Sequence, residues 1–173
     1  MKKRILVKSV LDSYTFIPAV TKGIDKRVLA TSMKTTGTYW INDTLSVMNE
    51  VVDLIERKKK LINLKCLIDD CFKNISSENA RLCVLRYVDK LSIKEISEIV
   101  EISERTTRRL LESALDEVYN YFSEQGFDSF NLLYYLKDEQ WIVGKYKNEI
   151  CKKLSLLKSG QKKKAIVNNC YIY

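Results

Sequence analysis

The sequence predicts an all-α protein, either one domain or one small domain with helical extensions. Only five of its 173 residues are glycine and one is proline, whereas sheet-rich folds use these residues heavily in their turns. Long stretches are rich in Leu, Ile, Lys and Glu, which are tolerated well in helices. Hydrophobic residues make up 46% of the chain and charged residues 30%, so the chain can bury a core and is not a disordered tail.

The first part of the chain, residues 1–41, reads as a basic N-terminal segment with little helical pattern. Pro18 and Gly23 are expected to interrupt any helix there. The run of residues 35–38, Thr-Thr-Gly-Thr, is typical of a loop. The apolar residues 39–41 that follow are expected to pack on the next element.

A long amphipathic helix is predicted within residues 42–74, from Asn42 to about Phe72. A mostly apolar stripe recurs in steps of three and four, at Leu45, Met48, Val52, Ile55, Lys59, Ile62, Cys66 and Asp69. Leu61, Leu64, Leu67 and Ile68 widen this apolar face. Such a helix either packs on its own domain or pairs in part with a second copy. The charged side chains of Lys59 and Asp69 within the stripe favour the first interpretation.

Three shorter helices are predicted in residues 75–126, the segment with the clearest local signals. They cover about Glu78–Asp89, Ile93–Val100 and Glu104–Ser123. Ser92 and Glu95 have the spacing of a capping box at the start of the second helix. Gly126 is expected to end the third helix in a left-handed conformation. Residues 127–173 then form a helical extension with a basic tail.

Positive charge is concentrated at the two ends of the chain. Residues 1–41 carry eight basic and two acidic side chains, and residues 145–173 carry eight and one. Residues 75–122 hold seven basic and nine acidic side chains. Basic ends suit a polyanion, of which nucleic acid is the commonest in a cell. The alternative is that these lysines only keep a helical protein soluble.

The cysteines and the missing histidine argue against a metal site. The chain has five cysteines and no histidine, and no two cysteines have the spacing of a zinc knuckle. Cys66, Cys71 and Cys83 lie among apolar residues and are expected to act as small apolar fillers. Lys8 and Asp12 interrupt the apolar start too early for a signal peptide, and no run of 18 apolar residues predicts a membrane span. A cytoplasmic protein without cofactors is expected.

The segment from Ile93 to Ser113 has the spacing of a helix-turn-helix. Ser97 is small where the two helices cross, and Ile102 fills the turn. The outward strip of the second helix contains the side chains predicted to read bases, which are Glu104, Arg105, Arg108, Arg109 and Glu112. The side chains predicted to contact phosphates are Ser92, Lys94, Ser103, Thr106, Lys162, Lys163 and Lys164.

Three stretches carry a resemblance to a known family. They are Arg-Leu-Cys-Val-Leu-Arg-Tyr at 81–87, Leu-Ser-Ile-Lys-Glu-Ile-Ser at 91–97 and Ile-Ser-Glu-Arg-Thr-Thr-Arg-Arg-Leu at 102–110, with Ala114 and Leu115 after them. The segment 75–122 resembles region 4 of the bacterial sigma-70 family. That resemblance implies a small helical domain that reads the promoter −35 element and contacts the flap of RNA polymerase. The long preceding helix also resembles that of small sigma-like transcription activators of phages in low-GC Gram-positive bacteria.

Two positions depart from the family pattern, and one region has no counterpart. Glu101 stands where such motifs often have glycine, and Thr107 replaces the commoner valine. A side chain at a left-handed turn residue costs about 1–2 kcal/mol. No stretch resembles sigma region 2, the part that binds the polymerase clamp and opens the −10 element.

These patterns predict a regulator of transcription that binds a specific double-stranded DNA sequence, as a sigma-like activator. The alternatives are a divergent sigma factor acting with core RNA polymerase, or a sigma-like module that binds only protein. RNA polymerase and a second copy of the chain are candidate partners, and no membrane is expected.

An enzyme is disfavoured because the chain lacks histidine and any cluster of glycines that could hold a phosphate. Two adjacent acidic pairs, Asp69-Asp70 and Asp138-Glu139, are expected to lie on solvated faces, because adjacent side chains of a helix diverge.

Overall fold

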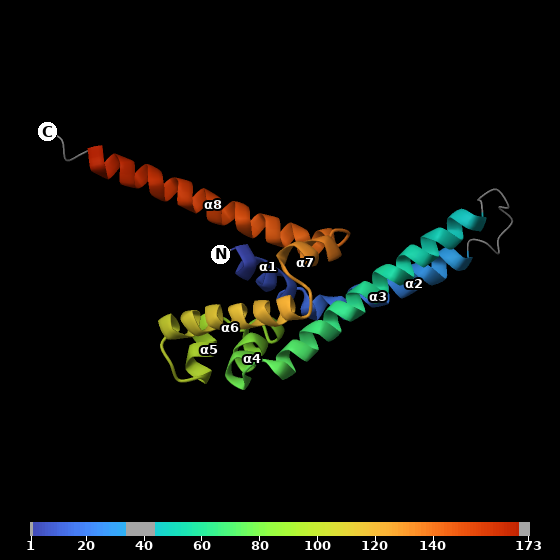
Figure 1. Cartoon of the computed structure of the whole chain (residues 1–173), viewed down its shortest axis with the longest axis horizontal. Coiled ribbons are helices and arrows are strands. Elements are labelled where there is room, and N and C mark those ends of the chain that lie inside the picture. The colour runs from blue at the N-terminus through green and yellow to red at the C-terminus, as the bar shows by residue number, and fades with distance from the viewer. Residues whose placement is uncertain (1, 34–43, 170–173) are drawn as a thin grey trace.

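The computed structural model describes residues 2–33 and 44–169, with side chains for residues 3–33 and 44–155. Every element in these ranges is helical (Figure 1), so the predicted all-α fold class is confirmed. Residues 35–38 and the apolar cluster at 39–41 lie outside the described residues. The elements are α1 (Lys2–Leu11), the 3-10 turn η1 (Tyr14–Phe16), α2 (Ile17–Met33), α3 (Thr44–Asn74), α4 (Ser77–Cys83), the π-helical turn η2 (Val84–Val88), α5 (Ile93–Ile99), α6 (Glu104–Glu124), α7 (Ser129–Tyr135) and α8 (Gln140–Asn169).

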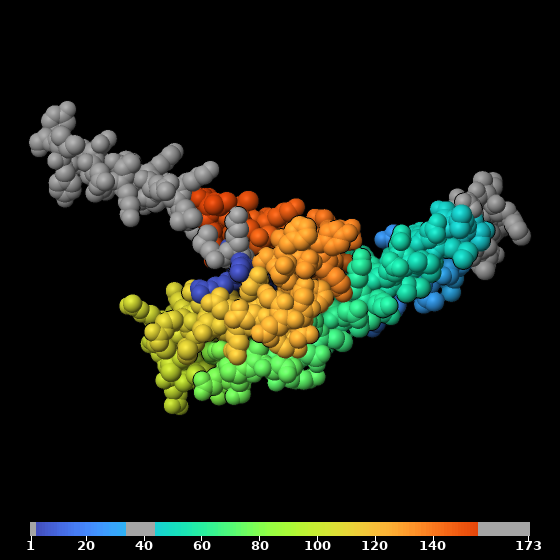
Figure 2. Space-filling model, in the orientation of Figure 1, coloured from blue at the N-terminus to red at the C-terminus, as the bar shows by residue number. Residues whose placement is uncertain are grey.

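Helix α6 lies at the centre of the arrangement. Helices α4 and α5 pack on one side of it, and α1 packs on the other side, between α6 and the first half of α8 (Figure 1). Helices α2 and α3 form an antiparallel hairpin that projects from this body, as the space-filling view in Figure 2 shows. The far half of α8 extends in the opposite direction from the hairpin.

Residues 2–33 form two helices, so the expectation that Pro18 and Gly23 interrupt any helix is wrong. Pro18 is the second residue of α2, where the missing N–H has no partner to lose. Gly23 lies inside α2, and a Cβ there would meet nothing within 4 Å. Its cost of about 1 kcal/mol relative to alanine is outweighed by the packing of α2 on α3.

Helix α1 is part of the core. Leu6, Val7, Val10 and Leu11 are almost fully buried, because α6 covers one side of the helix and α8 covers another. The charged residues Lys3, Arg4 and Lys8 of α1 remain exposed or partly exposed, so the helix keeps a charged side although α6 and α8 cover the rest of it.

Helix α3 is long, but the face that it buries differs from the one expected. The side chains packed into the core are Leu54, Leu61, Leu64, Ile68 and Cys71. Most of the stripe in steps of three and four faces solvent instead, and Met48, Val52, Ile55 and Ile62 are among the exposed apolar residues. The widening residues of the predicted face are thus the ones that hold α3 to the body.

The junction between α7 and α8 is tied to α3 by a buried carboxylate. Glu139 is only 4% exposed and accepts hydrogen bonds from Arg57 Nε at 2.7 Å, Arg57 Nη2 at 2.9 Å and Trp141 Nε1 at 2.6 Å. Burial alone would raise the pKa of Glu139, but these donors outweigh burial and lower it. The expectation of a solvated Asp138-Glu139 pair is therefore wrong for Glu139, because α3 supplies a fork of donors that sequence spacing does not reveal.

Two of the three cysteines expected to be apolar fillers are buried. Burial raises the pKa of the Cys71 and Cys83 thiols to about 12, whereas Cys66 is exposed on α3. Among the described residues, no group of acidic, Cys or His side chains could hold a metal ion. No helix in residues 2–33 or 44–169 is both long and apolar enough to span a bilayer.

We predict that Arg57→Ala lowers the free energy of unfolding by about 2 kcal/mol at neutral pH, because Glu139 then stays buried without its cation. Lys60→Ala removes the exposed Lys60–Asp138 pair and serves as the control, with a loss below about 0.5 kcal/mol. Because the pKa of Glu139 is lower in the folded protein than in the unfolded chain, its ion pair stabilises the fold at pH values above the ordinary glutamate pKa. This stabilisation is lost as the pH falls below about 4. Urea denaturation at pH 7 and pH 3.5 measures both effects. Equal losses for the two variants would contradict this role.

Candidate nucleic-acid interface

Helix α5 begins with the capping box that the sequence predicts. Ser92 Oγ accepts a hydrogen bond from the Glu95 amide at 3.2 Å, and Glu95 Oε2 accepts one from the Ser92 amide at 2.7 Å. The hydrogen bond with the Ser92 side chain, and then that with the Ser92 backbone amide, lower the pKa of the Glu95 carboxylate. The two capping bonds satisfy amides that a helix start leaves without partners, and so define where α5 begins.

The turn between α5 and α6 is the tight turn of a helix-turn-helix. Glu101 has φ of +56°, which confirms the left-handed conformation inferred from the glycine usual at this position. The Ile102 amide donates to the Ser97 carbonyl at 3.1 Å and closes the turn. Ser97 and Ile96 are buried where α5 meets α6. The small residue predicted at this crossing is therefore buried.

Helix α6 separates its residues onto two faces. The buried face consists of Thr107, Leu111, Ala114, Leu115, Val118 and Phe122. Thr107, which replaces the usual valine, is fully buried and its hydroxyl donates to the Ser103 carbonyl at 3.1 Å. This bond satisfies the buried polar atom, so the replacement is accommodated. The opposite face contains the residues predicted to read bases.

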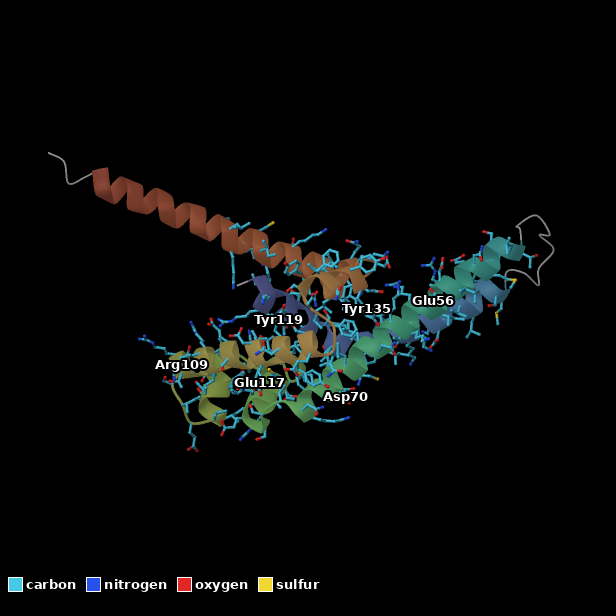
Figure 3. The ribbon with its side chains drawn as sticks, in the orientation of Figure 1. Glu56, Asp70, Arg109, Glu117, Tyr119 and Tyr135 are labelled. Carbon is cyan, nitrogen blue, oxygen red and sulfur yellow. The ribbon has the colours of Figure 1, made fainter. Side chains whose placement is uncertain are left out.

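On this outward face the arginines are exposed, and Glu104 is positioned by one of them. Arg108 Nη2 lies 3.1 Å from Glu104 Oε2, one helical turn away. Arg105 and Arg109 are exposed and have no salt-bridge partner among the described residues. Figure 3 shows Arg109 near the N-terminal end of α6. The first two turns of α6 therefore present guanidinium groups to solvent.

Glu112, at the far end of the same strip, is held by α1. Arg4 Nη1 donates to Glu112 Oε2 at 2.7 Å, and the same guanidinium donates two further bonds to Asp116, from Nε at 2.6 Å and from Nη2 at 2.5 Å. The Arg4 bond is the main cause of the lowered pKa of Asp116. Helix α1 therefore binds the strip beyond Arg109 through Arg4, and a base contact from Glu112 would compete with this ion pair.

Four of the residues predicted to contact phosphates, Ser92, Lys94, Ser103 and Thr106, lie at the starts of α5 and α6. Ser103 Oγ accepts from the Thr106 amide at 3.2 Å and lies 2.9 Å from the Thr106 hydroxyl. Ser92 and Lys94 are exposed at the start of α5. Lys162, Lys163 and Lys164 fall within α8, but their side chains lie outside the described ones.

Glu117 on α6 orients α4 against the motif. It accepts from the Ser76 amide at 2.9 Å, the Ser76 hydroxyl at 3.0 Å and Asn79 Nδ2 at 2.6 Å. The Asn79 bond contributes most to the lowered pKa of Glu117. Ser76 precedes the first residue of α4, so a side chain from a distant helix satisfies the amide there.

The fold brings both basic ends of the chain beside the outward face of α6. A hollow of about 230 Å³ lies among α1, α6 and the middle of α8. Its basic lining residues are Arg4, Lys8, Arg86, Arg108 and Lys153. Sequence reasoning missed Arg4, Lys8 and Lys153 as neighbours of the motif. The charge concentrated at the two ends was the only signal, and it does not reveal which lysine lies near Arg108.

The comparison with protein families agrees with this geometry. Residues 75–120 match the family model described as sigma-70, region 4. This segment is a sigma-70 region 4-like helix-turn-helix. No curated protein and no solved structure matches the chain. The chain therefore carries a DNA-binding module of a transcription family that is linked to RNA polymerase.

Proposed function

We propose that the chain is a sequence-specific regulator of transcription that binds double-stranded DNA as a sigma-like activator. The observation that carries the proposal is the position of Arg105, Arg108 and Arg109 on the exposed face at the start of α6. In a helix-turn-helix, the N-terminal residues of the second helix enter the major groove and contact base edges.

The proposed base contacts follow from the chemistry of this strip. An arginine can bind guanine O6 and N7 through two parallel hydrogen bonds, and a glutamate can accept from cytosine N4. The Glu104–Arg108 pair is exposed enough to exchange its internal bond for such contacts. Glu112 marks the end of the reading strip, because Arg4 already binds it.

The proposed phosphate contacts use residues from several parts of the chain. Ser92, Lys94, Ser103 and Thr106 flank the reading strip, and Lys162, Lys163 and Lys164 lie farther along α8. The segment 75–122 has more acidic than basic side chains, so on its own it is poorly suited to a polyanion. The basic residues of α1 and α8 that border the hollow compensate for this deficit.

An activator is favoured over an autonomous sigma factor by what the preceding helices do. A sigma factor must also hold core polymerase and separate the strands. In this chain α1 is buried against α6 and α8, and α2 is paired with α3. These helices support the motif or project from it as a hairpin, which suits a protein that binds duplex DNA and leaves strand separation to another factor.

We predict that Arg108→Ala and Arg109→Ala each lose about 1–3 kcal/mol of discrimination where a guanine contact is lost. Arg27→Ala on α2, which removes an exposed arginine paired with Glu50, is the matched control and keeps the base preference. Footprinting and binding titrations on a selected duplex measure the effect. An unchanged base preference in both α6 variants would overturn the assignment of reading residues.

We further predict that the protein added to core polymerase alone does not start transcription, but that it binds a specific duplex near a promoter. The experiment is in vitro transcription with core enzyme, with and without the housekeeping sigma factor. Specific initiation without that factor would show a divergent sigma factor. Binding to the polymerase flap with no binding to any duplex would show a module that binds only protein.

A further inference from the structure

One face of α3 leaves a regular apolar stripe uncovered in the part of the chain that the structure describes. We define the α3 seam as Met48, Val52, Ile55, Lys59 and Ile62. The exposed fractions of its apolar members are 59%, 50%, 52% and 43% in chain order. The cyan half of α3 forms part of the projecting hairpin in Figure 2. Large exposed apolar surfaces of this kind are typical of interaction sites.

The spacing of the α3 seam is that of a helix-pairing surface. Its members are separated by four, three, four and three residues, which is the heptad pattern of coiled coils. At 100° per residue, the seam lies on roughly the opposite side of α3 from the buried residues Leu54, Leu61, Leu64 and Ile68. Helix α3 therefore has one face for its own chain and a second face patterned for another helix.

We propose that the α3 seam binds the same seam of a second copy of this chain. The two α2–α3 hairpins then pack as an antiparallel four-helix arrangement, with a two-fold axis between Asp53 and Leu54. In this register Val52 faces Ile55 of the second copy, and Met48 faces Lys59 of the second copy. Val47, Met48, Val51 and Val52 line an open hollow of about 280 Å³, which accepts the facing side chains.

Charge along the seam favours the antiparallel register over a parallel one. A parallel pair in register would place Lys59 against Lys59, with like charges inside the interface. In the antiparallel register the aliphatic stem of Lys59 lies along Met48, and its ammonium group reaches solvent. The flanking pairs become Asn49 with Glu56 and Val51 with Lys58, so no like charges meet.

This assembly has a consequence for DNA, although the proposal does not depend on the proposed function. Asn74, the last residue of α3, is about 20 residues from the axis, or roughly 30 Å at 1.5 Å per residue. The two helix-turn-helix units therefore lie at opposite ends of the dimer. They suit two half-sites separated by more than one turn of DNA, since one turn is about 34 Å.

Sedimentation equilibrium of the full chain without DNA tests the proposal. We expect a dimer at micromolar concentrations, and a monomer for Val52→Glu with Ile55→Glu, at unchanged helix content by circular dichroism. Met48→Glu alone, on an exposed side chain one turn away, weakens dimerisation in the same direction. The control combines Ala30→Glu with Ser46→Glu, two exposed positions outside the seam, and stays dimeric. A monomeric wild-type chain at tens of micromolar, or a dimer that survives all seam variants, overturns the proposal.

The exposed Cys66 side chain distinguishes an antiparallel from a parallel pairing of the two α3 helices. It continues the heptad spacing beyond Ile62, so a parallel pair would bring the two Cys66 residues together. In the antiparallel register they lie roughly 37 Å apart, far beyond the reach of a disulfide. In a chain with Cys151→Ser and Cys170→Ser, mild oxidation is expected to leave the dimer without a covalent link. A disulfide-linked dimer through Cys66 would overturn the antiparallel register.

Discussion

The two-faced pattern of α6 is the constraint on which the rest of this structure depends. Its buried face, from Thr107 to Phe122, packs against helices from both sides. Because that face is fixed, the arginines at the start of the helix must point away from the core. The capping bonds of Ser103 and the left-handed turn at Glu101 set where this outward face begins. Loss of the buried face would remove the exposed arginine surface together with the core.

The positive charge beside the helix-turn-helix also comes from distant parts of the chain. The helix-turn-helix is mildly acidic by itself, and the basic residues that surround it come from α1 and α8. Arg4 binds both Glu112 and Asp116 at one end of the outward face and offsets part of their negative charge, so the positive charge of this face is at the arginine end. Two chain ends that are far apart in sequence therefore complete an electrostatic surface that the motif lacks alone.

The features predicted correctly from the sequence are local ones. The capping box at Ser92 and Glu95, the left-handed residues Glu101 and Gly126, and the spacing of the motif each depend on a few neighbouring residues. Prediction failed where a distant helix decides the outcome. The partner of Glu139 is on α3, and the burial of α1 depends on α6 and α8, which lie far along the chain. For α3, periodicity indicates apolar faces, but the positions of α2, α4 and α6 decide which face is covered.

The central claim is that DNA bound to the arginine end of α6 also touches α8, because Arg108 and Lys153 border one hollow. A photo-crosslinking amino acid placed at position 153 tests this most directly. Position 134 on α7 is the control, because Tyr134 is 65% exposed and does not line the hollow. With the selected duplex, we predict a crosslink from position 153 that is lost when Arg108 and Arg109 are replaced by alanine. A crosslink from position 134 but none from position 153 would contradict the account.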